Sequence, residues 1–203
     1  MANFNGRCLL LAAALLLAMP AVSHAVREGD FQMAAQAGWS VLADQDVLAD
    51  NAGFGGNLAY GLFDWLAFEL DGLYSTHTEA DESDTGELKL ELARFGAGPR
   101  FTLGGRMVEG WADLLVGATW QRWEYKSLES EPDGDAIKED DTSGSAALLP
   151  GAGVDFYISD MFQLGLAARY TWSFSTDEIR TDRGDRDLPA TCFDILLRAS
   201  LLF

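Results

Sequence analysis

The chain has 203 residues, of which 48% are hydrophobic and 21 are glycine; this length and composition are typical of one folded domain and unlike those of a disordered chain. Its 32 acidic residues outnumber its 14 basic residues, which gives a formal net charge of −18. This acidity argues against a nucleic-acid-binding protein, because phosphate backbones select clustered Lys and Arg.

The chain begins with the features of a secretory signal peptide. One basic residue, Arg7, precedes a continuous apolar run over residues 8–18. We expect cleavage after Ala25, with cleavage after Ala21 as the alternative. The run is shorter than the ~20 residues that a membrane-anchoring helix needs. The expected organisation is therefore a cleaved signal peptide, residues 1–25, followed by one domain, residues 26–203.

Eight later segments have the alternation of β-strands, each with a face that is free of charge through its centre. Successive side chains of a strand point to opposite faces, so that apolar residues recur at every second position. Phe162, Leu164 and Leu166, for example, alternate with Gln163 and Gly165. A length of roughly 10 residues matches a tilted strand that crosses a bilayer. The segments are residues 31–41, 53–62, 66–75, 94–103, 108–121, 148–158, 162–174 and 191–203.

Two places interrupt this alternation. Over residues 87–93 the apolar phase is opposite to that of the strand that follows. This inversion predicts either a bulge near Ala93 or an extension of the strand beyond the lipid. Trp111 and Leu115 also fall on the otherwise polar phase of the fifth segment.

The connections between the segments alternate in length. Short links are expected at 63–64, 104–105 and 159–160, and long polar loops at 43–51, 76–86, 126–145 and 175–187. Transmembrane barrels have short periplasmic turns and longer extracellular loops. An even number of strands also returns the C-terminus to the periplasm.

Periodicity does not say which face is buried, so a soluble lipocalin-like barrel with an apolar lumen is the competing fold. An eight-stranded barrel has an interior just wide enough for its own side chains. Here the apolar face carries large residues and the polar face is rich in glycine, which suits apolar residues outside, against lipid. The sheet must close, because hydrocarbon leaves an unpaired strand edge unsatisfied. The pattern predicts an all-β, eight-stranded antiparallel up-and-down transmembrane β-barrel.

The last segment carries a family resemblance. Phe193, Ile195 and Leu197 share one face, Asp194 lies on the other, and the run ends on Phe203. This resembles bacterial outer-membrane β-barrels, and the whole mature chain is similar to small eight-stranded barrels of the OmpA, OmpX and opacity-protein type. The resemblance implies location in the bacterial outer membrane and contact with its lipid and lipopolysaccharide. It also implies that Phe203 is the C-terminal assembly signal, read by the outer-membrane barrel assembly machinery.

Charged residues on the polar faces are the candidate site. Charges held away from bulk water must pair, so we expect a charge network that fills the lumen. A continuous ion path between the glycines is the alternative. The expected lumen residues are Glu69, Asp71, Arg94, Arg100, Glu109, Asp113, Asp155, Arg169, Asp194 and Arg198. Arg169 and Asp194, at comparable heights on the last two strands, are expected to pair.

Candidates for catalysis are few. His77, the one histidine after residue 25, lies near Ser75, and such a pair supports acyl transfer in principle. Its local sequence does not match the His-x-Ser arrangement expected of the outer-membrane lipid A deacylases, so we expect a solvated loop histidine. Cys192, on the inward phase, is expected to be a small packed side chain. No cofactor, metal or catalytic residue is expected.

The long loops are acidic, above all residues 126–145. We expect a solvated loop there; divalent cations that bridge it to lipopolysaccharide phosphates are the alternative. The predicted function is that of a monomeric outer-membrane protein with a structural, surface-exposed or adhesion-type role and a charge-plugged lumen. A narrow channel for ions or small solutes is the second hypothesis, and a lipid A acyl-modifying enzyme is the third.

Overall fold

The computed structural model describes residues 28–42, 51–80, 86–104, 107–130, 136–174, 176–181, 184–189 and 191–203. The predicted signal peptide, residues 1–25, lies outside these ranges. Within them, no helix is long and apolar enough to cross a membrane.

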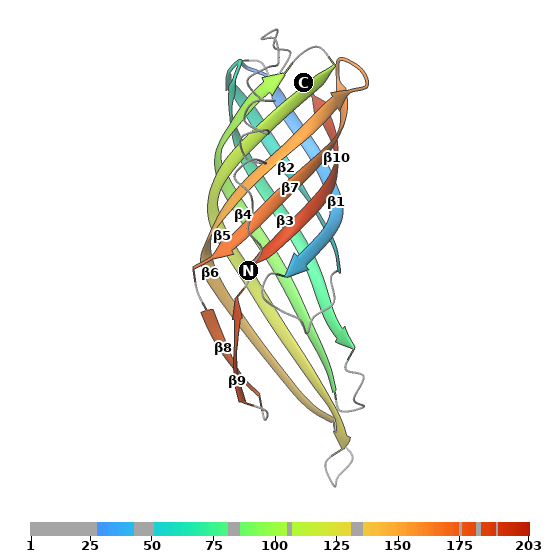
Figure 1. Cartoon of the computed structure of the whole chain (residues 1–203), viewed down its shortest axis with the longest axis vertical. Coiled ribbons are helices and arrows are strands. Elements are labelled where there is room, and N and C mark those ends of the chain that lie inside the picture. The colour runs from blue at the N-terminus through green and yellow to red at the C-terminus, as the bar shows by residue number, and fades with distance from the viewer. Residues whose placement is uncertain are drawn as a thin grey trace, which may run out of the picture.

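Eight of the described strands form one closed antiparallel barrel in the order β1-β10-β7-β6-β5-β4-β3-β2 (Figure 1). The barrel closes where β1 meets β10, and the main chains of Phe31 and Phe203 exchange two hydrogen bonds there, of 3.1 and 2.9 Å. The predicted fold is confirmed. The barrel strands are β1 (Phe31–Leu42), β2 (Asn51–Phe63), β3 (Leu66–Ala80), β4 (Gly86–Gly104), β5 (Val108–Ser130), β6 (Ala136–Tyr157), β7 (Phe162–Ser173) and β10 (Cys192–Leu202).

Two further strands lie between β7 and β10 in the sequence. β8 (Thr176–Thr181) and β9 (Gly184–Pro189) pair only with each other, as a two-stranded sheet separate from the barrel. The last of the predicted long loops, residues 175–187, thus contains a small β-hairpin.

Alternation sets the two faces of the wall. Along β10, Ile195 and Leu197 are exposed on the outside, whereas Asp194 and Arg198 are buried inside. The same pattern recurs in the other strands, so that the outside of the barrel is lined with large apolar side chains. Such a surface is stable against hydrocarbon, and a closed barrel leaves no strand edge within it.

Aromatic rings gather near both ends of the apolar belt. Phe63, Trp65 and Phe101 form a stacked row on the outer surface, with ring centroids 6.0 and 6.1 Å apart. At the opposite side of the apolar belt, Trp172 and Phe174 contact each other with a centroid distance of 5.9 Å. Aromatic girdles of this kind mark the two lipid–water interfaces of transmembrane barrels.

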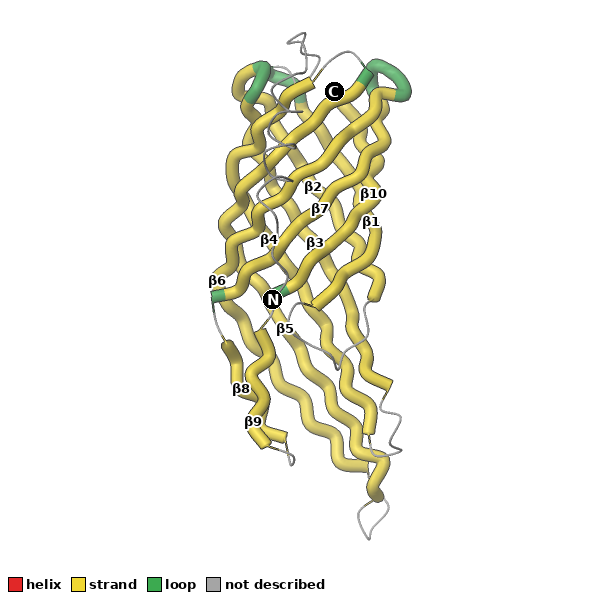
Figure 2. The backbone as a smooth tube through the Cα atoms, viewed as in Figure 1, coloured by secondary structure: helices red, strands yellow, loops and turns green. Residues whose placement is uncertain are grey.

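The two ends of the barrel differ, as Figure 2 shows. One end, called the turn end below, carries the short connections β2–β3, β4–β5 and β6–β7 together with Phe203. The other end is called the hairpin end below. There, four strands run well past the remaining ones as a four-stranded sheet, namely β3, β4, β5 and β6 (Figures 1 and 2).

This sheet corrects the loops predicted over residues 76–86 and 126–145. β3 continues to Ala80 and pairs with Glu87 on β4, and β6 begins at Ala136, paired with Ser130 on β5. The polar composition that suggested loops is compatible with a sheet beyond the lipid, where both faces can contact water. The part of each strand within the barrel already fixes its register, so each residue added beyond it gains main-chain hydrogen bonds to the neighbouring strand.

The inverted phase of residues 87–93 has a simple origin. β4 pairs with β3 and with β5 in an unbroken register through Ala93, so there is no bulge. Of the two alternatives, the strand extension is correct. Leu90 and Leu92 keep the inward phase of Arg94 and point into the barrel, where both are buried.

Candidate functional site

The interior of the barrel holds the predicted charged residues. The structure places all ten on inward positions of β3, β4, β5, β6, β7 and β10, and none is more than 6% exposed. Because strands alternate, inward residues of one strand are separated by an even number of positions. The set is Glu69, Asp71, Arg94, Arg100, Glu109, Asp113, Asp155, Arg169, Asp194 and Arg198.

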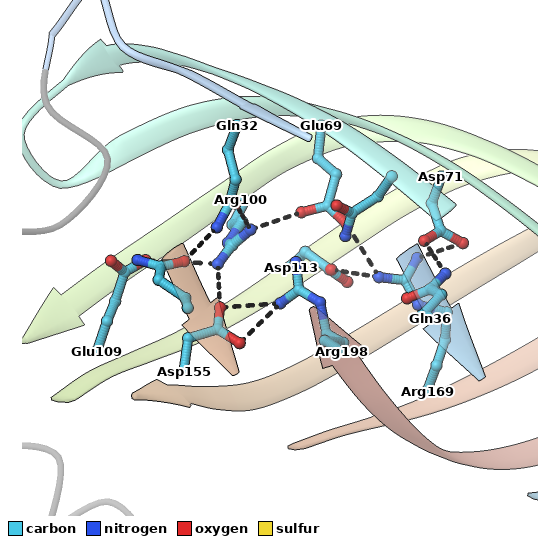
Figure 3. A network of polar contacts seen from close by, with 12 residues as sticks. Gln32, Gln36, Glu69, Asp71, Arg100, Glu109, Asp113, Asp155, Arg169 and Arg198 are labelled. Carbon is cyan, nitrogen blue, oxygen red and sulfur yellow. Dashed lines mark hydrogen bonds and ion pairs between the residues drawn. The ribbon is translucent and has the colours of Figure 1, made fainter. Parts of the chain in front are cut away.

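Arg100 is the centre of the contacts near the turn end (Figure 3). Its Nη2 lies 3.0 Å from Asp155 Oδ2 and 3.4 Å from Glu109 Oε1. Its Nη1 donates to Gln32 Oε1 at 2.6 Å and lies 3.4 Å from Glu69 Oε2. One guanidinium thus joins side chains from five strands, its own included, which matches its several fixed donors.

Arg169, on β7, gathers a second group of carboxylates, which come from β3 and β5. Its Nη2 lies 2.6 Å from Asp113 Oδ2 and 3.2 Å from Glu69 Oε1, and its Nη1 lies 3.2 Å from Asp71 Oδ1. Glu69 therefore contacts both Arg169 and Arg100 and links the two groups (Figure 3).

Trp111 fills the space between two cations. Its ring lies 4.6 Å from the guanidinium carbon of Arg100 and 4.5 Å from that of Arg198, so that both cations stack on the same indole. Arg198 in turn lies 3.1 Å from Asp155 Oδ2. Sequence reasoning noted Trp111 on the polar phase without assigning it a role; its inward phase within a set of arginines was the available signal.

Interior glycines provide the room for these side chains. A Cβ at Gly153 would collide with the ring of Trp111, and a Cβ at Gly165 would collide with the carboxylate of Asp155. Gly153 and Gly165 therefore face side chains from other strands.

The predicted pair of Arg169 and Asp194 does not form. The two residues are direct partners in backbone register, yet Asp194 Oδ2 accepts from Arg94 Nη1 at 2.5 Å. Arg94 comes from β4, across the lumen. The long side chain of Arg94 reaches across the interior to Asp194, a contact that neighbouring register alone does not predict.

His77 is also corrected. It is fully buried on the inward face of β3 and not solvated in a loop, and its Nε2 lies 3.2 Å from Ser75 Oγ. Arg94 Nη2 lies 3.4 Å from the same hydroxyl, and Arg94 Nη1 contacts the Sγ of the buried Cys192. Ser75 and His77, the pair considered for acyl transfer, do contact each other, but in the buried interior of the barrel.

An apolar layer lies beside this polar group at the hairpin end. Leu42, Leu90, Leu92, Trp123 and Cys192 form one buried cluster contributed by β1, β4, β5 and β10. The inverted phase of β4 supplies two of its leucines. The interior thus changes from ion pairs to packed apolar side chains as it approaches the projecting sheet.

No group of three or more His, Cys, Asp or Glu side chains among the described residues is arranged to hold a metal ion. The interior contacts described above neutralise charge and fill space. Several uncharged side chains that sequence reasoning did not single out add to it, namely Gln32, Gln36, Asn57, Tyr157 and Gln163, which hydrogen-bond to the charged set or to each other.

A family model described as the outer membrane protein beta-barrel domain matches residues 9–190 of the chain. The chain belongs to that family. It is therefore an outer-membrane β-barrel protein, as the family resemblance of its sequence implied. No curated protein sequence matches it significantly.

Solved outer-membrane barrels share the fold of this family member at low sequence identity. Ail, the attachment invasion locus protein of Yersinia pestis, is 17% identical with a TM-score of 0.55, over 87% of this chain and 99% of that one. OprG from Pseudomonas aeruginosa is 14% identical with a TM-score of 0.57, over 87% and 97%. A major outer membrane protein from Thermus thermophilus is 12% identical with a TM-score of 0.58, over 86% and 99%.

Proposed function

We propose that the mature protein, residues 26–203 after removal of the signal peptide, is a monomeric outer-membrane barrel with a structural, surface-exposed or adhesion-type role and no catalysis. The observation that carries this proposal is the contrast between the two parts of the molecule. The interior is filled by ion pairs and apolar side chains, while four strands project from one end as a sheet.

The projecting sheet supports a role at the cell surface. Loops and extensions on a rigid scaffold are where barrels make contacts, and short connections are typical of the periplasmic side. The hairpin end therefore faces outward in this proposal. One protein with a similar fold, Ail, carries the name attachment invasion locus protein, which is in keeping with an adhesion-type role.

The proposed partners follow from the two surfaces. The apolar outer wall contacts membrane lipid, and the hairpin end, which carries the acidic residues 126–145, lies among lipopolysaccharide headgroups. Phe203, paired with Phe31 at the closing seam, is proposed as the signal for the barrel assembly machinery.

The filled interior also speaks against the second hypothesis, a narrow channel. Arg100, Trp111 and Arg198 occupy the middle of the lumen as one stack. An eight-stranded barrel has no spare width around such a stack.

Conductance in planar bilayers tests the proposal. The wild-type protein should insert without discrete current steps, because its lumen is occupied. A variant with Arg100→Ser and Trp111→Gly, which empties the middle of the lumen, should show small steps and so demonstrate that the assay detects an open barrel. Wild-type steps of the same size as those of the variant would favour the channel.

A further inference from the structure

We propose that the central cluster of the interior holds two protons in the folded protein, shared among Asp71, Asp113 and Glu109. The central cluster is defined as five carboxyl groups and three guanidinium groups. Its members are Glu69, Asp71, Glu109, Asp113 and Asp155 with Arg100, Arg169 and Arg198. This inference concerns the folded interior and does not depend on what the projecting sheet contacts.

The first step is the balance of charge. Five carboxylates against three guanidinium groups would leave an excess of two negative charges, in a space where each of these side chains is at most 6% exposed. The remaining ion pair of the predicted set, Arg94 with Asp194, is balanced by itself. A buried carboxylate without a compensating cation takes up a proton instead of remaining charged.

The second step identifies the carboxylates that stay ionised. Asp155 lies 3.0 Å from Arg100 and 3.1 Å from Arg198. Glu69 lies 3.2 Å from Arg169 and 3.4 Å from Arg100, and it also accepts from Asn57 at 3.1 Å. Each of these two carboxylates is shared by two guanidinium groups, which is the arrangement that favours the charged form.

The third step concerns the other three carboxyl groups, which have fewer cations. Asp71 and Asp113 both depend on Arg169, whose contacts they divide with Glu69. Asp113 Oδ1 has no hydrogen-bond partner among the described residues. An unpartnered buried oxygen costs much less free energy on a neutral carboxylic acid than on a carboxylate.

Three other strands contribute to the environment of Asp113. Asp113 on β5 faces Arg169 on β7, Glu69 and Asp71 on β3, and Arg100 on β4. Two of these four neighbours are carboxylates.

Glu109, the third carboxyl group, has its own set of neighbours. It accepts from the hydroxyl of Tyr157 at 2.7 Å and has its nearest cation, Arg100, at 3.4 Å. Asp155 and Arg198 also act on it electrostatically. Because the carboxyl groups interact strongly, the two protons belong to the group and not to single residues.

A bound cation is the alternative means of neutralisation. The described carboxylates of the interior are not arranged as a metal site, and arginine side chains occupy the space between them (Figure 3). Protons need no such space. The geometry therefore favours protons as the ligand of this cluster.

Infrared spectroscopy of the protein in lipid vesicles at neutral pH tests the proposal. Protonated carboxyl groups give a C=O stretching band separate from that of carboxylates, and the wild-type protein should show it. Asp113→Asn should remove about half of the band, because one of two shared protons loses its site. Asp160→Asn, which changes an exposed acid at the turn end, is the control and should leave the band unchanged. Absence of the band in the wild-type protein would overturn the proposal.

A second measurement covers the case in which Asp113→Asn does not fold. If the native state binds more protons than the unfolded state, stability must fall as pH rises. The urea midpoint of the wild-type protein should therefore decrease from neutral to alkaline pH, and Glu109→Gln should reduce the decrease. A midpoint that does not change with pH but rises with sodium concentration would show bound cations instead of protons. Conductance is read separately, so an open lumen would contradict the proposed function without deciding this question.

Discussion

The buried cations named above are all arginines, and their geometry explains why. Arg100 contacts Gln32, Glu69, Glu109 and Asp155 with only two nitrogens. A lysine offers one compact charge on a flexible stem and could not hold four partners from four strands in fixed directions. Arginine also stacks on Trp111, as Arg100 does here. The interior is therefore held together by planar groups, such as that of Arg100, that each join several strands.

The pair of Arg94 and Asp194 gives a direct test of this cross-lumen pairing. Arg94→Met or Asp194→Asn alone should lower the free energy of unfolding by about 3–5 kcal/mol, because each leaves an uncompensated buried charge. The double variant should lose much less than the sum. Urea unfolding from lipid vesicles measures all the variants.

A matched cycle with Arg169 and Asp194 is the control. These residues are register partners but ion-pair elsewhere, so their single losses should add within about 0.5 kcal/mol. Strong coupling in this control, with additivity for Arg94 and Asp194, would restore the pairing predicted from sequence and contradict the structure.

The projecting parts of β5 and β6 are similar in length but differ in their number of paired neighbours. The projecting part of β5 pairs with β4 on one side and β6 on the other. The projecting part of β6 pairs only with β5, because its pairing with β7 begins at Ala147. Within the described residues, β6 is therefore an edge strand beyond the barrel and an interior strand within it.

Amide hydrogen exchange in detergent micelles should reveal this edge. Every second backbone amide of residues 136–141 faces away from β5 and should exchange at least about tenfold faster than the amides of residues 119–124 on β5, which have strands on both sides. Residues 151–156 of β6, paired on both sides, provide the control within the same strand. Uniform protection along β6 would mean that another segment covers its edge.

The two ends of the whole molecule differ. Short turns and the closing seam with Phe203 lie at one end, and the projecting sheet lies at the other. The apolar belt between them determines which part lies in the lipid but not which end faces outward. The proposed direction, with the hairpin end outside, rests on the lengths of the connections.

Cysteine labelling of whole cells checks this orientation. Gly144→Cys is at an exposed position where an added Cβ meets only ordinary contact with the Thr119 carbonyl oxygen, at 3.6 Å. It should react with an impermeant maleimide, whereas Asp160→Cys at the turn end should react only after the cells are broken. The native Cys192 is fully buried and should give little background. Labelling of Asp160→Cys in intact cells would reverse the topology.

Much of this architecture follows from local pattern. Alternation with a period of two predicts the barrel strands and the face of each residue, since a strand has only two faces. It correctly assigns Asp194 and Arg198 to the inside and Ile195 and Leu197 to the outside. The short turns and the closed antiparallel order also follow from the chain, because hydrocarbon permits no open edge.

Pairing across the lumen could not be predicted in this way. Which arginine meets which carboxylate depends on strand tilt and stagger around the closed sheet, and on side chains long enough to reach a distant strand. Asp194 therefore meets Arg94 instead of Arg169. The prediction for His77 was wrong for a related reason: its burial depends on the pairing of β3 with β4 beyond the lipid, and the polar sequence of β3 there gives no sign of that pairing. Period-two pattern describes one strand at a time, whereas these contacts exist only once the sheet has closed.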